Sequence, residues 1–345
     1  MKTIDTVEAV GTVLCHDLTR IVKDEVKETA FRKGHVVRPE DIPVLLSMGK
    51  TRLFVWDLGP DMLHENEAAL ALGQALGLDD GFAVSEAREG RVTLTAARDG
   101  LFLADLGLLE TVNGDDGIGV AIRQSGVQVR KGEEVAGLKI IPLAIGRERV
   151  GRIGEALGGR PLLAIKPFLP LRAAIVATGS EVFHGRIRDS FTPVVEEKLA
   201  GYGIGVVARR LCDDDLEAIA GAVRDCVGQG AGLVVCTGGM SVDPDDLTPG
   251  AIKAAGAEIV SYGAPVMPGA MFLVAYLGQV PVLGLPGCVM FGKRTIFDVI
   301  MPRIAAGLRV TRDEIRRMGH GGLCAGCPEC VFPACGFGRG WPYGL

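Results

Sequence analysis

The sequence lacks several features that would place the protein in a membrane, in a secretion pathway or on nucleic acid. No stretch of its 345 residues approaches the roughly 18 consecutive apolar residues that a membrane-spanning helix needs. The first residues run into charged positions without an apolar core, so no secretory signal peptide is predicted. The formal net charge of −5 offers no basic surface for nucleic acid or anionic lipid. We therefore expect a cytoplasmic protein with no membrane and no nucleic-acid partner.

Internal repeats and low-complexity tracts are also missing, and the composition is that of a folded protein. Hydrophobic residues make up 48% of the chain and charged residues 23%, which is typical of globular rather than disordered proteins. The length is sufficient for two or three hydrophobic cores. We expect a β-rich region over residues 1–170, an α/β domain over 171–309 and a cysteine-rich tail over 310–345.

The first region carries short apolar runs interrupted by glycine. Residues 52–56, 91–95 and 120–123 have the alternation and the β-branched content of strands, and a helix is expected near 67–76. These patterns predict small lobes that are mostly β-structure. Two prolines at the end of the region, in residues 166–170, oppose both a helix and a central strand and predict a linker.

The second region alternates short apolar strands with helices. That alternation predicts a three-layer α/β/α domain whose sheet is mostly parallel and is covered by helices on both faces. Asp213 is expected to cap the second helix. The expected strands are 173–177, 204–208, 232–236 and 280–284. Three expected helices begin at Thr192, Asp213 and Thr248, and a fourth is expected over 289–306.

Glycine-rich and acidic segments follow each of these strands. Because the carboxyl ends of parallel strands lie at one edge of a sheet, we expect the four segments to converge. Glycines let backbone N–H groups approach an anion closely, and neighbouring hydroxyls add hydrogen-bond donors, which together suit a phosphate or an oxyanion. Carboxylates beside a phosphate favour Mg²⁺ between them. The segments are 178–181, 212–215, 237–241 and 285–287, and Asp246 follows the third.

The order of motifs in this region is specific. TGSEV, GRIRDSF, a DD step, TGGMSVDPDDLTP, MPG and LPG follow one another across residues 178–287. This order resembles the domain shared by molybdopterin molybdotransferases, molybdopterin adenylyltransferases and gephyrin. The family's usual asparagines are replaced by Phe191 and Cys288, and its proline by Val289.

The resemblance implies roles for individual residues. Glu181 and Asp246 would organise metal and oxyanion, and Asp213 would assist Mg²⁺ binding or phosphoanhydride cleavage. The glycine loops would hold the pterin and its phosphate. The residues implied in binding the cofactor are Thr178, Gly179, Ser180, Thr237, Gly238, Gly239, Ser241, Pro268, Gly269, Pro286 and Gly287.

Some 170 residues precede the α/β domain, as in a molybdotransferase, and they include a segment at 31–49 that resembles that family. The resemblance therefore implies insertion of molybdate into molybdopterin or adenylyl-molybdopterin, catalysed by electrostatic positioning. Two alternatives stay open: a non-catalytic carrier or sensor of the cofactor that serves a molybdoenzyme, and a molybdopterin adenylyltransferase. A homo-oligomer is also expected, because homologues of the domain commonly self-associate.

Four of the nine cysteines are crowded into the tail, at Cys324, Cys327, Cys330 and Cys335. This spacing predicts ligation of zinc or of an iron–sulfur cluster, with a redox or disulfide role as the alternative. The tail is too short for its own core, so a metal or docking would have to order it. Three other cysteines lie on or beside expected core elements and are predicted to be small buried hydrophobic residues: Cys212, Cys226 and Cys236.

Overall fold

The computed structural model describes residues 2–22, 26–55, 60–76, 78–338 and 340. The chain forms two compact units. One comprises residues 1–98, 103–125 and 130–165, and the other residues 99–102, 126–129 and 166–345. Across the described ranges, no helix combines the length and the hydrophobicity that are needed to cross a lipid bilayer.

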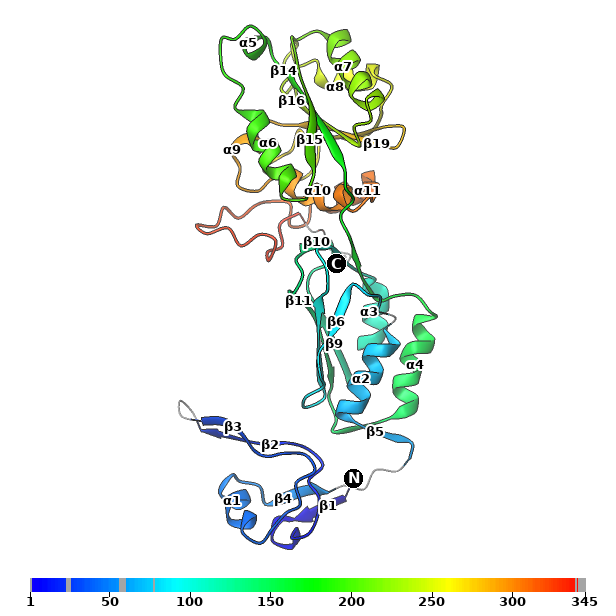
Figure 1. Ribbon diagram of the computed structural model, residues 1–345, viewed down its shortest axis with the longest axis vertical. Helices are drawn as coiled ribbons and strands as arrows, with labels where there is room; N and C mark the ends of the chain where they lie inside the picture. The colour runs from blue at the N-terminus through cyan, green and yellow to red at the C-terminus, as the bar shows by residue number, and fades with distance from the viewer. Residues whose placement is uncertain (1, 23–25, 56–59, 77, 339, 341–345) are drawn as a thin grey trace. The chain divides into compact units, whose positions relative to one another are not determined.

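The first unit contains short strands and several helices (Figure 1). In chain order, the elements over residues 2–166 are β1 (Lys2–Asp5), η1 (Thr6–Glu8), β2 (Leu18–Val22), β3 (Val26–Phe31), α1 (Asp41–Ser47), β4 (Arg52–Val55), β5 (Met62–His64), α2 (Glu65–Ala75), β6 (Phe82–Val84), β7 (Arg91–Ala96), β8 (Gly100–Ala104), α3 (Leu106–Asn113), β9 (Ile118–Ile122), β10 (Val127–Val129), β11 (Glu134–Ile140), β12 (Ala144–Gly146), α4 (Arg147–Leu157) and β13 (Leu163–Lys166). Of these, β10 and residues 100–102 of β8 belong to the second unit.

The largest sheet of this unit is four-stranded, in the order β6-β7-β11-β9, with antiparallel pairs. Along β7, Val92, Leu94 and Ala96 are buried while the residues between them are more exposed, which is the two-residue period of a half-buried strand. Helix α2 packs on β7 and β11, and α3 packs on β9. One face of the sheet is therefore covered and the other is open.

The three strands expected in this region are confirmed as β4, β7 and β9, and the expected helix as α2. Trp56, the last residue of the run 52–56, lies outside the described residues. The sequence analysis did not anticipate α1, α3 and α4. In α4 the buried residues Val150, Ile153 and Leu157 recur at helical spacing, so a signal for that helix was present.

The second unit is built around the α/β domain. Its further elements are β14 (Arg172–Thr178), α5 (Ser180–Phe183), α6 (Phe191–Ala200), β15 (Gly205–Cys212), α7 (Leu216–Gly228), β16 (Leu233–Thr237), α8 (Thr248–Ala254), β17 (Glu258–Tyr262), β18 (Leu273–Leu277), β19 (Val280–Leu285), α9 (Cys288–Phe291), α10 (Ile296–Ala305) and α11 (Arg312–Arg317).

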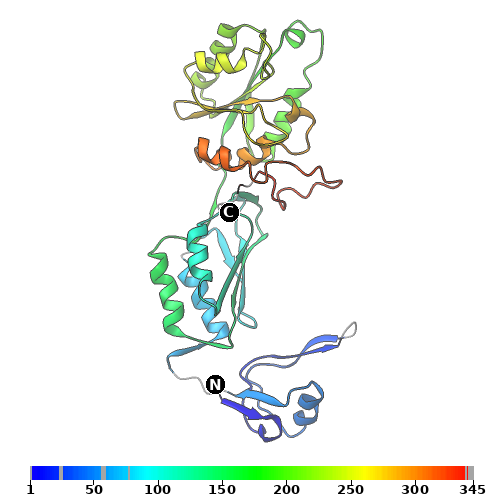
Figure 2. The same ribbon diagram turned by 180° about the vertical axis from the view of Figure 1, so that it is seen from behind.

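The sheet of this domain has six strands in the order β15-β14-β16-β19-β18-β17. The first four are parallel to one another, and β18 and β17 are antiparallel to their neighbours. Helices α6 and α10 cover one face of the sheet, and α7 and α8 cover the other (Figures 1 and 2). The expected three-layer architecture with a mostly parallel sheet is confirmed.

Two local expectations in this domain are wrong. The helix expected over 289–306 is divided into α9 and α10, because Thr295 and Asp298 form a capping box that starts a new helix after Gly292. Helix α7 is capped by Asp215, whose carboxylate accepts a hydrogen bond of 2.7 Å from the Ala218 amide. Asp213 is therefore not the cap and is free for other contacts.

The cysteine-rich tail docks on the α/β domain. Phe337 is 5% exposed and belongs to the core between the sheet and α10, and Phe332 packs beside it. The Met267 peptide forms a bridge to the tail: its N–H donates to the Gly322 carbonyl at 2.7 Å, and its carbonyl accepts from the Cys324 amide at 2.9 Å. Apolar burial and these two backbone hydrogen bonds hold the described part of the tail.

Candidate functional site

The ends of the four parallel strands lie side by side. Thr178 at the end of β14 pairs with Cys212 at the end of β15. Ala177 pairs with Thr237 at the end of β16, which pairs with Leu285 at the end of β19. The segments that follow these residues, 179–183, 213–215, 238–247 and 286–287, therefore all start from one edge of the sheet, as the sequence analysis expected.

Buried hydroxyls hold two of these segments together. The Thr178 hydroxyl lies 3.2 Å from the Thr237 carbonyl and 3.1 Å from the Thr248 hydroxyl, which donates to the Gly238 carbonyl at 2.8 Å. Thr178 is 6% exposed and Thr237 is 2% exposed. The Thr178 and Thr248 side chains thus fix the loop geometry, and Thr237 takes part through its carbonyl. Thr248 is part of this network, although the sequence predicted it only as the start of a short helix.

Gly238 and Gly239 are required by this close packing. Both have positive φ angles, +87° and +55°. A Cβ atom on Gly238 would lie 2.2 Å from the Thr178 carbonyl oxygen, and one on Gly239 would lie 2.8 Å from the Thr248 hydroxyl. No L-residue with a side chain fits the first position without moving the backbone. The glycines therefore bring the loop after β16 directly against the end of β14.

The loops after β14 and β15 carry the predicted acids Glu181 and Asp213. Glu181 lies on α5 and its side chain is exposed. The Asp213 carboxylate lies 3.2 Å from His184 Nε2. Asp214 joins the two loops, since its carboxylate accepts a hydrogen bond of 2.8 Å from the Ser180 amide. Neither His184 nor Asp214 was predicted from the sequence. His184 had no evident interaction partner in the sequence, and Asp214 is the middle residue of a run of three aspartates.

Asp246 lies in the loop after β16, beside Tyr262. Its carboxylate accepts a hydrogen bond of 2.9 Å from the Asp243 amide. Tyr262 at the end of β17 donates to the carbonyls of Met240 and Ser241. Burial, and secondarily the negative charge of Asp246, raise the pKa of the Tyr262 hydroxyl. Tyr262, which the sequence analysis also missed, thus anchors the segment that carries the predicted ligand residue Ser241.

In each of the two remaining motifs, one of the two predicted residues is buried. Gly287 after β19 is exposed, and Pro286, which precedes α9, is buried. Pro268 and Gly269 are engaged with α10: the Pro268 carbonyl accepts from the Ile296 amide at 3.2 Å, and a Cβ on Gly269 would lie 2.5 Å from the Ile296 side chain. Packing against α10 is thus sufficient reason for the glycine at position 269.

The structure does not gather a preformed metal site. Within the described ranges, no three His, Cys, Asp or Glu side chains are close enough together to hold a metal ion. For Mg²⁺ this arrangement is compatible with binding, because the ion commonly uses one or two carboxylates with phosphate oxygens and water. It does not fit zinc or an iron–sulfur cluster in the tail, which need several thiolates at once. Cys324 and Cys335 are partly buried, and Cys327 and Cys330 are exposed.

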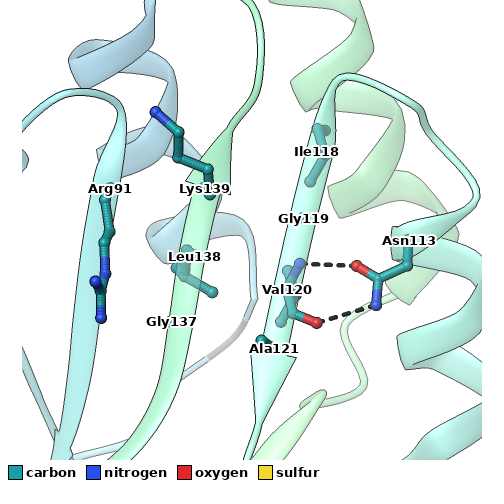
Figure 3. A pocket seen from close by; sticks show the side chains of 9 residues that line it. All are labelled: Arg91, Asn113, Ile118, Gly119, Val120, Ala121, Gly137, Leu138 and Lys139. Carbon is teal, nitrogen blue, oxygen red and sulfur yellow. Dashed lines mark hydrogen bonds between the residues drawn. The ribbon is translucent and has the colours of Figure 1, made fainter.

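The first unit contains a separate hollow on the open face of its four-stranded sheet (Figure 3). Its volume is about 510 Å³, and Gly119, Gly137 and Ala121 contribute no more than a methyl group to its floor. Arg91 and Lys139 also line it, and Lys139 lies 3.7 Å from the Glu65 carboxylate. The Asn113 side chain hydrogen-bonds both the N–H and the carbonyl of Val120, which closes this part of the β9 edge to another strand.

Two known protein families match separate parts of the chain. Residues 174–306 match the family described as a probable molybdopterin binding domain, and residues 3–57 match a domain of unknown function. The first match extends from within β14 to just past the end of α10 and includes every strand-end segment described above.

Individual relatives match parts of the chain. The molybdopterin molybdenumtransferase of Synechococcus elongatus is 28% identical over 210 residues, which are 57% of this chain and 49% of that protein. A CinA-like protein of Mycolicibacterium vanbaalenii is 36% identical over 77 residues, 22% of this chain and 18% of that protein. The chain thus spans about half the length of the first relative and less of the second.

Two solved structures are similar to part of this chain. The molybdopterin biosynthesis enzyme MoaB of Thermus thermophilus covers 39% of this chain and 91% of its own, with 20% identity and a TM-score of 0.33. CinA of Thermoplasma acidophilum covers 39% of this chain and 97% of its own, with 21% identity and a TM-score of 0.33.

Proposed function

Because residues 174–306 belong to the molybdopterin-binding domain family, we propose that this chain is a molybdopterin molybdotransferase-like enzyme. It binds molybdopterin, in the adenylylated form, at the edge of the α/β sheet and promotes insertion of molybdate. Molybdopterin and molybdate are substrates in this proposal. The observation that carries it is the strand register, which places the segments after Thr178, Cys212, Thr237 and Leu285 at one edge.

The glycine loops are the proposed cradle for the phosphates. Gly179 leaves its backbone uncovered, with nothing within 4 Å of its Cβ position. The hydroxyls of Thr178 and Thr248 keep the loop of Gly238 and Gly239 fixed before a ligand arrives. Such a rigid set of backbone N–H groups and hydroxyls is suited to an oxyanion. The phosphates of the ligand would also supply oxygen atoms to Mg²⁺, with Glu181 and Asp246 as the proposed protein carboxylates.

Catalysis in this proposal depends on position and charge. A bound Mg²⁺ would neutralise charge on the phosphates and on molybdate. Tyr262 holds the Met240 and Ser241 carbonyls, and so fixes the loop from which Asp246 extends. The recipient molybdoenzyme and a homo-oligomeric state stay predictions.

The direct test is turnover by the purified full chain. Incubation with adenylyl-molybdopterin, Mg²⁺ and molybdate should release AMP and yield active cofactor, and omission of molybdate or Mg²⁺ should reduce both. Tight binding without AMP release would mean that the protein is a cofactor carrier and not an enzyme. Formation of adenylyl-molybdopterin from molybdopterin and ATP would instead identify an adenylyltransferase. Absence of binding would contradict all three functions.

A further inference from the structure

A histidine and an aspartate face each other across the two strand-end loops. His184 follows α5, and its Nε2 atom lies 3.2 Å from the Asp213 carboxylate. The side chains are 50% and 39% exposed, respectively, so water and a ligand can reach them. The bond of 2.8 Å between the Ser180 amide and Asp214 ties together the same two loops. The pair is therefore part of the edge described above and not an isolated surface contact.

Both members of the pair are oriented by further contacts. The second oxygen of Asp213 accepts a hydrogen bond of 3.0 Å from the Asp214 amide, which leaves the first facing the imidazole. The His184 ring packs edge-on against Phe183, with ring centroids 5.3 Å apart. Within the described ranges, His184 Nδ1 has no hydrogen-bond partner. A carboxylate on Nε2 favours the proton there and leaves Nδ1 with a lone pair, which is the arrangement of an oriented general base.

We propose that His184 is the general base for cleavage of the phosphoanhydride, and that Asp213 holds and stabilises it. This inference rests on the proposed function. Nδ1 takes a proton from a water molecule as its oxygen bonds to the adenylyl phosphorus. The bond from that phosphorus to the bridging oxygen breaks, AMP is formed, and the bridging oxygen stays with molybdopterin as a phosphate oxygen. The proton stays on His184 opposite the Asp213 carboxylate until it passes to solvent.

The assignment separates two roles that the sequence analysis left open for Asp213. One oxygen of the Asp213 carboxylate faces His184 Nε2 at 3.2 Å and the other accepts a hydrogen bond from the Asp214 amide, so neither oxygen is without a contact that a cation would have to replace. Proton transfer is therefore assigned to Asp213 and His184, and the metal to the other acids of the edge. General-base catalysis commonly contributes about 10²–10⁴ in rate, so the loss of His184 should be large.

The test compares His184→Gln, His184→Ala and the wild-type chain in AMP release from adenylyl-molybdopterin. Glutamine can donate to Asp213 but cannot accept the proton, so kcat should fall about 100-fold while KM changes less than about threefold. Added imidazole should restore part of the activity of His184→Ala but none of that of His184→Gln. Asp213→Asn should lower kcat, and the double variant should be no slower than the slower single variant.

A matched control is available in the first unit. His35 Nε2 lies 2.6 Å from the Asp41 carboxylate, so His35→Gln disrupts an equivalent pair outside the α/β domain and should leave kcat unchanged. Circular dichroism and substrate affinity identify any variant that fails to fold. If His184→Gln fails to fold, the rescue of His184→Ala by imidazole decides whether His184 is the general base.

Normal turnover by His184→Gln, or failure of imidazole to restore His184→Ala, would overturn the inference and leave the proposed function intact. If the wild-type chain binds substrate but releases no AMP, both the enzymatic function and the base are wrong.

Discussion

The edge of the α/β sheet and the cysteine-rich tail make an instructive contrast. The residues of the edge are distant in sequence, from Thr178 to Gly287, yet strand register places their loops together. The four tail cysteines fall within residues 324–335, yet in the described tail they form no metal-binding cluster. Topology can gather distant residues at one edge of a sheet, whereas close spacing alone does not gather neighbouring ones.

The largest effect should come from Gly238→Ala, which tests how closely the loops of the edge pack. The new Cβ would meet the Thr178 carbonyl at 2.2 Å in a backbone with φ of +87°. We expect a loss of about 4 kcal/mol in the free energy of unfolding, measured by urea denaturation. Gly185→Ala is the matched control, because its φ is +69° but nothing lies within 4 Å of its Cβ position. It should cost about 1 kcal/mol, and equal losses would contradict the packing argument.

A somewhat smaller effect should follow from Phe337→Ala in the tail. Phe337 is 5% exposed within the core beside α10, so its truncation should cost about 3 kcal/mol. Val331, which is 54% exposed, provides the control, and Val331→Ala should cost less than about 0.5 kcal/mol. Since docking holds the tail, a chelator should leave the melting temperature of the wild type unchanged. A large decrease with the chelator would mean that a metal orders the tail after all.

Asp246→Asn tests the metal and oxyanion role assigned to the edge. The rate of AMP release should fall about 100-fold, with substrate affinity changed less than threefold. Asp245, exposed in the same loop, is the control, and Asp245→Asn should retain the wild-type rate. Unchanged turnover by Asp246→Asn would remove that residue from the proposed site.

The smallest effect concerns the reactivity of the thiols. Cys327 and Cys330 are exposed, so a thiol reagent should modify them in the folded protein. Burial raises the pKa values of Cys212, Cys226 and Cys236, and these three should react only after unfolding. Mass spectrometry of labelled peptides measures the difference. Protection of Cys327 and Cys330 by added Zn²⁺, reversed by a chelator, would support the metal site that was predicted from their spacing.

The main elements of the α/β domain could be predicted because its central strands are short, continuous apolar runs. β14, β16 and β19 are almost entirely buried, and such runs between turn residues are typical of a sheet covered on both faces. β17 and β18 were missed, although LVAYL in β18 is an equally apolar run. The break between α9 and α10 was missed because apolar residues continue on both sides of Thr295.

The sequence predicted which loops form the candidate site, but not the contacts between their side chains. Sequence placed Glu181, Asp213 and Asp246 after strand ends, but could not decide which of three consecutive aspartates caps α7, because that depends on the backbone at Asp215. The partnership of His184 with Asp213 joins residues that are 29 positions apart and arises from the pairing of β14 with β15. Contacts across strands of this kind cannot be inferred from local pattern.

The central claim is that the strand-end loops form one binding site, and amide chemical shifts test it most directly. Full-length, deuterated and ¹⁵N-labelled protein would be titrated with adenylyl-molybdopterin and Mg²⁺, without molybdate. The amide signals of Gly179, Gly238, Gly239 and Gly287 should shift together with a single dissociation constant. Undisturbed signals at these glycines, with shifts confined to Gly119 and Gly137 in the hollow of the first unit, would contradict the account.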